Sequence, residues 1–93
     1  MQREFVHDFI SLWDTRTQRL MNDLTSGDRA DADVVLLSIR SSSRMLGLSA
    51  LEAAAALVHG ALKSGDLSQC LPYFERMSRI GHETCAELRE LMP

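Results

Sequence analysis

Apolar residues recur at steps of three and four along four successive stretches of this chain, and glycine-containing breaks separate the stretches. These steps match the period of an α-helix that buries one face. The breaks contain Gly27, Gly47 and Gly65, and glycine ends helices because it readily adopts the left-handed backbone conformation. No stretch has the pattern of a convincing strand. The sequence therefore predicts an all-α protein with four helices.

The first three helices are expected over about 2–25, 30–46 and 49–63, and the fourth stretch runs from Leu67 towards the C-terminus. Short connections favour an up-down-up-down four-helix bundle. Because domains cluster at roughly 100 to 150 residues, the whole chain, 1–93, is expected to form a single domain. The expected inward stripes are Val6, Ile10, Trp13, Thr17, Leu20 and Leu24; Ala32, Leu36, Ile39, Ser43 and Leu46; Leu51, Ala55, Val58 and Leu62; and Leu67, Leu71, Phe74, Met77, Gly81, Thr84, Leu88 and Leu91.

Two details concern helix ends. Ser49 and Glu52 have the spacing of a capping box at the start of the third helix. Pro72 lies inside the fourth stretch, where proline loses a backbone hydrogen bond and clashes with the preceding turn. We therefore expect a bend there, or a short turn before a main helix over about 72–91.

The charge balance narrows the possible partners. The formal net charge is −3, and no run of Lys or Arg is present, so neither nucleic acid nor a membrane surface is an expected partner. No apolar stretch approaches the roughly 20 residues that span a bilayer. The first residues also lack the plan of a secretory signal. We expect a cytoplasmic protein.

Cys70 and Cys85 both fall in the fourth helical stretch. At about 1.5 Å of rise per residue they would lie roughly 22 Å apart, which is too far for a disulfide. Neither cysteine has a histidine or a second cysteine at metal-ligand spacing. We expect two reduced packing residues, no metal and no cofactor.

The segment 36–47, LLSIRSSSRMLG, resembles the signature of histidine-phosphotransfer (HPt) domains. That signature reads roughly Ala-His-x-Leu-Lys-Gly-Ser-Ser/Ala-x-x-Leu-Gly. The matching positions are Ile39, Arg40, Ser42, Leu46 and Gly47. After the glycine, the family tends to show leucine, a small residue and leucine, followed by glutamate; this chain has Leu51, Ala55 and Val58, followed by His59. The Ser-Gly-Asp segments at 26–28 and 64–66 also resemble the turns that separate helices in the family. It implies an HPt-like bundle.

Two departures decide what the resemblance implies about function. Leu37 stands where the family has its phosphate-accepting histidine, and Ser41 stands where it has a glycine. In the family that histidine attacks an aspartyl phosphate on a receiver domain, and leucine has no nucleophilic nitrogen. The resemblance thus implies a non-enzymatic, pseudo-phosphotransfer module. It would bind a response-regulator receiver domain or a histidine kinase in two-component signalling without accepting phosphate.

The helical period places Leu37, Arg40, Ser41 and Arg44 on one face, away from the inward stripe. Two interpretations of Leu37 remain open. It belongs either to a wide buried sector with its apolar neighbours Val34 and Leu36, or to an exposed contact surface. A second apolar row on the first helix would extend such a surface. The expected partner-binding residues are Phe9, Leu12, Leu37, Arg40, Ser41 and Arg44.

The three histidines, His7, His59 and His82, are expected to be solvated surface residues. His59 is the best alternative phosphoacceptor, because it lies in the third helix beside the expected docking face and has Lys63 one turn later. The serines at 41–43 are expected to be packing or solvated residues. Two other functions stay open: active phosphotransfer through a displaced histidine such as His59, and a plain helical scaffold or homodimer.

Overall fold

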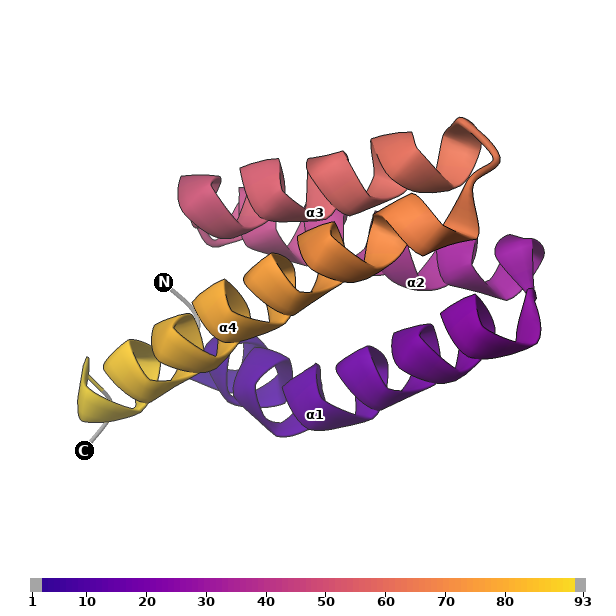
Figure 1. Cartoon of the computed structure of the whole chain (residues 1–93). Helices are drawn as coiled ribbons and strands as arrows, with labels where there is room; N and C mark the ends of the chain where they lie inside the picture. Colours follow the sequence, from indigo (N-terminus) through magenta and orange to yellow (C-terminus); the bar gives the residue numbers. More distant parts are fainter. Residues whose placement is uncertain (1–2, 92–93) are drawn as a thin grey trace.

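The computed structural model describes residues 3–91, which form four α-helices and no strand. The helices are α1 (Arg3–Ser26), α2 (Arg29–Met45), α3 (Ser49–Lys63) and α4 (Leu67–Leu91) (Figure 1). Their bounds confirm the predicted all-α class and the four predicted helices. None of these helices is long and apolar enough to cross a membrane.

Each helix packs against two others. α2 lies between α1 and α3, and α4 lies between α3 and α1. Figure 1 shows the α1–α2 and α3–α4 connections at the right of the molecule and the α2–α3 connection at the left. The result is an elongated molecule with extents of 42 × 20 × 18 Å, whose core runs along its length.

The core consists mainly of Leu, Ala and Val side chains with a few aromatic and sulfur-containing ones. Nearly all of the predicted stripe positions are buried or half-buried. Two are not: Leu71 and Leu91 are exposed. Cys70 occupies the core position that was predicted for Leu71, because the inward stripe of α4 advances by three residues from Leu67 to Cys70 and then by four to Phe74. Both cysteines are free and buried, as predicted.

Three glycines end α1, α2 and α3 with the backbone conformation that the sequence predicted. Gly27, Gly47 and Gly65 have φ values of 81°, 72° and 93°. These values lie in the left-handed region that other residues rarely adopt. Next to the first of them, Asp28 caps α2, and its carboxylate accepts a hydrogen bond of 3.1 Å from the backbone N–H of Asp31.

The predicted capping box at the start of α3 is wrong. Leu48 is the N-cap residue, and no side chain caps the helix there. Ser49 already lies within α3, so its hydroxyl is not placed to cap it. The Glu52 carboxylate instead accepts a 2.9 Å hydrogen bond from Arg44 Nε on α2.

Of the two alternatives expected at Pro72, the short turn before a separate main helix is wrong, because α4 is continuous from Leu67 and contains Pro72. Pro72 is exposed, so its ring lies against solvent rather than against the core. It also lies near the start of the helix, and Ser68, whose carbonyl it leaves without a backbone donor, is an exposed residue.

An aromatic residue joins α1 to α4. Trp13 is only 3% exposed and stacks on Phe9, with ring centroids 5.8 Å apart. On α4, the ring lies directly over Gly81: a Cβ atom at this glycine would lie 1.9 Å from Trp13 Cζ2. A residue without a side chain is therefore needed where α4 passes the indole.

Candidate functional site

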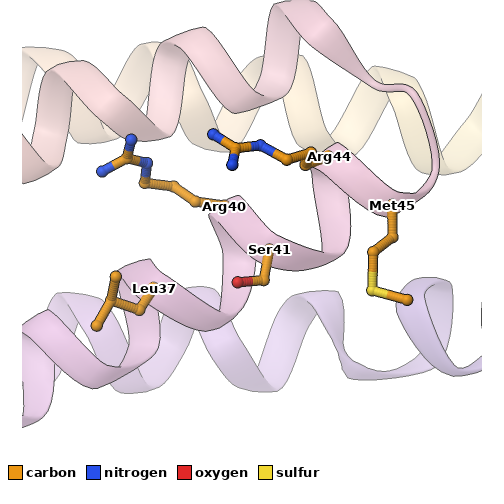
Figure 2. A pocket seen from close by; sticks show the side chains of 5 residues that line it. All are labelled: Leu37, Arg40, Ser41, Arg44 and Met45. Atoms are coloured by element: carbon orange, nitrogen blue, oxygen red, sulfur yellow. The ribbon is translucent and has the colours of Figure 1, made fainter.

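Leu37 lies near the middle of α2 and is 48% exposed, which excludes the interpretation that it belongs to a buried sector. It lines an open hollow of about 400 Å³ together with four other α2 residues, Arg40, Ser41, Arg44 and Met45. Figure 2 shows these five side chains along one face of the helix. We refer to Leu37, Arg40, Ser41, Arg44 and Met45 as the α2 face.

The apolar and the cationic side chains of the α2 face lie along different edges of it. Figure 2 shows Arg40 and Arg44 directed towards α3, whereas Leu37 and Met45 lie on the side of α1. Met45 is strongly exposed. The face therefore pairs an apolar edge with a cationic edge, and exposed Ser41 lies between them. Sequence reasoning omitted Met45, although its spacing of four residues from Ser41 and eight from Leu37 signals the same helix face.

Both arginines of this face are held by residues of α3. Arg44 forms an ion pair with Glu52, with 2.8 Å between Nη2 and Oε1. Arg40 Nη1 lies 3.0 Å from Nδ1 of His59. The guanidinium groups are thereby held at the edge of the hollow.

His59 is not a solvated residue, so the prediction for this histidine is wrong. Its side chain is only 2% exposed, and its Nε2 lies 2.5 Å from Oδ1 of Asp33 on α2. α3 is apolar nearly all round, and the ring of His59 lies between α3 and α2 rather than on the outer surface. The other two histidines, His7 and His82, are exposed as predicted.

The proposed use of His59 as a phosphoacceptor is not favoured by this geometry. Both ring nitrogens already have protein partners, Arg40 and Asp33. An attacking imidazole needs a free nitrogen lone pair that is open to the phosphorus atom. Neither requirement is met by the buried ring of His59.

The three serines of α2 have different surroundings. Ser43 is fully buried, and its hydroxyl donates to the carbonyl oxygen of Ile39 at 2.7 Å. Ser42 accepts a hydrogen bond of 3.4 Å from Arg16 Nη1 on α1. Partial burial lowers the pKa of the Arg16 guanidinium from its ordinary value. Ser41 alone of the three lines the hollow beside Leu37.

The two predicted contact residues of α1, Phe9 and Leu12, line the same hollow but differ in exposure. Leu12 is exposed and lines a smaller hollow of about 170 Å³ between α1 and α2, together with Arg16 and Ser42. Phe9 is 2% exposed, so the prediction that its side chain lies on the docking surface is wrong. The reason is its stacking on Trp13, which draws the ring of Phe9 into the core.

A second polar cluster lies at the other end of α2. Arg19 Nε donates to Asp31 Oδ2 at 2.8 Å, and this hydrogen bond lowers the pKa of the Asp31 carboxyl. The neighbouring Asp23 is buried, and its Oδ2 atom has no hydrogen-bond partner within residues 3–91. Burial, followed by the effect of nearby Asp31, raises the pKa of Asp23 to about 6.

The α2 face is suited to binding rather than to chemistry. Leu37 and Met45 supply apolar area, and Arg40 and Arg44 supply cationic donors for carboxylate or phosphate oxygens. Its one hydroxyl group, on Ser41, has no base among the five residues to activate it. Over residues 3–91, no group of three His, Cys, Asp or Glu side chains is placed to hold a metal ion.

Comparisons with family models, curated proteins and solved structures gave no match to this chain.

Proposed function

We propose that this protein is an HPt-like interaction module of two-component signalling, and that its α2 face binds a receiver domain or a histidine kinase without accepting phosphate. The observation that carries the proposal is the exposure of Leu37 at the position where the HPt signature has its histidine. An exposed leucine flanked by two arginines is a contact surface with no phosphoacceptor. A module of this kind would act in the cytoplasm, where its partners are.

The order in which the helices contact one another supports the topology that we propose, an up-down-up-down bundle of HPt type. Consecutive helices are neighbours, and α4 closes the ring against α1. Their connections are short, at 27–28, 46–48 and 64–66, and successive connections lie at opposite ends in Figure 1. Short connections join antiparallel neighbours in such bundles.

The proposed mechanism is occupation of the partner. Leu37 and Met45 would bury apolar area against it, and Arg40 and Arg44 would contact its acidic groups. Leucine offers no nitrogen to a phosphoryl group, so a bound receiver would keep its aspartyl phosphate. The complex would hold the partner or block its access to an active phosphotransfer domain.

The test uses a pair of leucines with similar exposure. Leu37 is 48% exposed on the α2 face, and Leu57 is 44% exposed on α3, outside the hollow. Calorimetry would measure binding of the purified chain to receiver and kinase domains from the same cell. We expect Leu37→Asp to weaken binding at least tenfold, because about 1.4 kcal/mol or more is lost when an apolar contact is replaced by a charge. Leu57→Asp should bind as the unaltered chain does.

Phosphate transfer is followed in the same samples. Incubation with a phosphorylated receiver should leave no acid-labile phosphate on this chain. Label that disappears in a His59→Gln variant would instead establish phosphotransfer through the displaced histidine. A tight homodimer in light scattering that Leu37→Asp disrupts, with no binding to either class of partner, would identify a scaffold module and overturn the proposal.

A further inference from the structure

A partly buried hydrogen-bonded chain connects the α2 face to the space between α2 and α3. It runs from Asp33 Oδ1 to His59 Nε2, over 2.5 Å, and from His59 Nδ1 to Arg40 Nη1, over 3.0 Å. Asp33 and Arg40 are seven residues apart on α2, a spacing that places them on one side of the helix. His59 of α3 lies between them and is almost completely buried.

The partners of the ring fix its protonation. A guanidinium group has N–H donors and no acceptor, so Nδ1 of His59 must accept the hydrogen bond from Arg40. A carboxylate is an acceptor, so Nε2 must carry the hydrogen that points to Asp33. The structure therefore corresponds to a neutral imidazole with its proton on Nε2.

We propose that His59, oriented by Asp33, is a positioning residue for Arg40, and that a proton taken up at Nδ1 of His59 releases Arg40 from its place on the α2 face. The effect of this release on partner binding rests on the proposed function. The positioning itself does not, because it is a property of the free chain.

The physical reason is a change from attraction to repulsion. A proton on Nδ1 turns this atom from an acceptor into a donor, and the ring then carries a positive charge beside the guanidinium of Arg40. Two cationic donors cannot share a hydrogen bond, whereas the contact of Nε2 with Asp33 becomes an ion pair. Protonation therefore keeps the Asp33 contact and breaks the Arg40 contact.

The charged groups around the ring come mainly from α2. Asp33 and Arg40 are its two direct partners. On α3 itself, Lys63 lies one turn later and is exposed, and Glu52 is paired with Arg44. On α4, the other neighbour of α3, the ionisable groups at buried positions are the thiols of Cys70 and Cys85, whose pKa values are raised by burial, so both stay uncharged near neutral pH.

The first test needs no partner. The full chain would be labelled with ¹⁵N in its histidine and arginine side chains and followed by NMR from pH 8 to pH 5, the range in which histidines change charge. At pH 8 we expect an unprotonated Nδ1 and a protonated Nε2 on His59. As Nδ1 takes up its proton, the side-chain signals of Arg40 should shift in step. His7 and His82 are exposed and serve as controls, since their titration should leave Arg40 unaffected.

A proton on Nδ1 of His59 at pH 8, or Arg40 signals that do not follow the ring, would overturn the positioning role. His59→Gln provides the conservative variant, because a glutamine amide can donate to Asp33 and accept from Arg40 but does not titrate. In that variant the Arg40 signals should stay constant over the whole pH range.

The second test measures consequences for binding. We expect the chain to bind its receiver or kinase partner roughly three- to tenfold more weakly at pH 5.5 than at pH 8, the range expected when one ordered side chain loses its fixed position. The affinity of the His59→Gln variant should fall between pH 8 and pH 5.5 only as far as titration of the partner's own groups lowers it. If NMR shows the coupling but no partner binds, the proposed function fails and the positioning role stands. If the partner binds, and the unaltered chain and the His59→Gln variant lose the same affinity between pH 8 and pH 5.5, the proposed regulation of binding by His59 is wrong.

Discussion

Trp13 and Leu37 are both large apolar side chains, but Trp13 belongs to the core and Leu37 belongs to the exposed surface. Trp13 is 3% exposed and has a glycine opposite it on α4, whereas Leu37 is 48% exposed and lines an open hollow. Both occupy the middle of a helix. The difference lies in what the neighbouring helix offers: Gly81 makes room for the indole, and none of the four described helices covers Leu37.

This contrast separates residues that stabilise the fold from residues that are free to bind. Apolar area that is buried within the chain contributes about 25 cal/mol per Å² to folding. Leu37 buries only about half of its surface, and the rest is available to a partner. Substitutions in the α1–α4 contact should therefore act on stability, and substitutions on the α2 face should act on binding. Substitutions at three positions test this division, and a fourth substitution, at Asp23, tests the polar cluster; each is measured by the free energy of unfolding in urea.

The largest effect is expected for Phe9, which was predicted as a surface contact and is buried against Trp13. Phe9→Ala should lower the free energy of unfolding by about 3 kcal/mol or more, because it leaves a cavity in the core. Leu12→Ala, on the same helix but exposed, is the control and should change it by less than about 0.5 kcal/mol. Equal losses of free energy of unfolding in the two variants would contradict the assignment of Phe9 to the core and Leu12 to the surface.

A smaller loss is expected at the glycine beneath Trp13. Gly81→Ala places a methyl group where the indole lies, so the free energy of unfolding should fall by about 1–3 kcal/mol. Gly60→Ala is a matched control on α3, where an added Cβ atom meets nothing within 4 Å. That substitution should raise stability by about 0.5–1 kcal/mol, because alanine favours the helix. A stable Gly81→Ala chain would mean that Trp13 is free to move.

The polar cluster at the start of α2 predicts a pH dependence. The pKa of Asp23 is raised to about 6 in the folded chain, from about 3.9 in an unfolded one, so folding favours its protonated form. Its stabilising contribution is complete below about pH 4 and is lost as the pH rises through 6. Asp23→Asn should therefore be more stable than the unaltered chain at pH 7.5 and should show a flatter pH profile between 4 and 7. Asp14→Asn removes one negative charge at an exposed position on the same helix and serves as the control for the loss of charge alone.

The smallest effect on stability is expected on the α2 face itself. Leu37→Gln should change the free energy of unfolding by no more than about 0.5 kcal/mol, since glutamine is a good helix former and the site is half exposed. The adjacent Leu36 is fully buried, and Leu36→Gln should cost several times more because it buries an amide without a partner. A large loss in Leu37→Gln would show that this leucine serves the fold.

The helices and their inward stripes could be predicted from the sequence because burial follows the helical period. Val6, Trp13 and Leu20 are buried at the positions that the pattern gave them. The same period placed Leu37 away from the inward stripe, but the sequence alone left open whether this leucine is buried or exposed. The HPt-like topology and the function stay predictions.

What could not be predicted depends on contacts between helices. His59 lies on a helix that is apolar nearly all round, so the period of that helix does not indicate which face is covered. Its partner Asp33 is 26 residues away, and no local signal links them. Glu52 likewise has the spacing of a capping residue, yet it pairs with Arg44 of the neighbouring helix. Phe9 was misplaced for a different reason: it stacks on Trp13 of its own helix, and the sequence pattern did not indicate that this second apolar row is also buried.

Trp13 is the single tryptophan of the chain, and this gives the molecule a built-in optical reporter. Its emission comes from the contact between α1 and α4, whereas the α2 face contains no aromatic residue. A partner that docks on α2 should leave the colour of this fluorescence unchanged. A shift to the red on mixing would mean that water has reached the indole, and therefore that the partner separates α1 from α4 instead of resting on the surface of the folded protein.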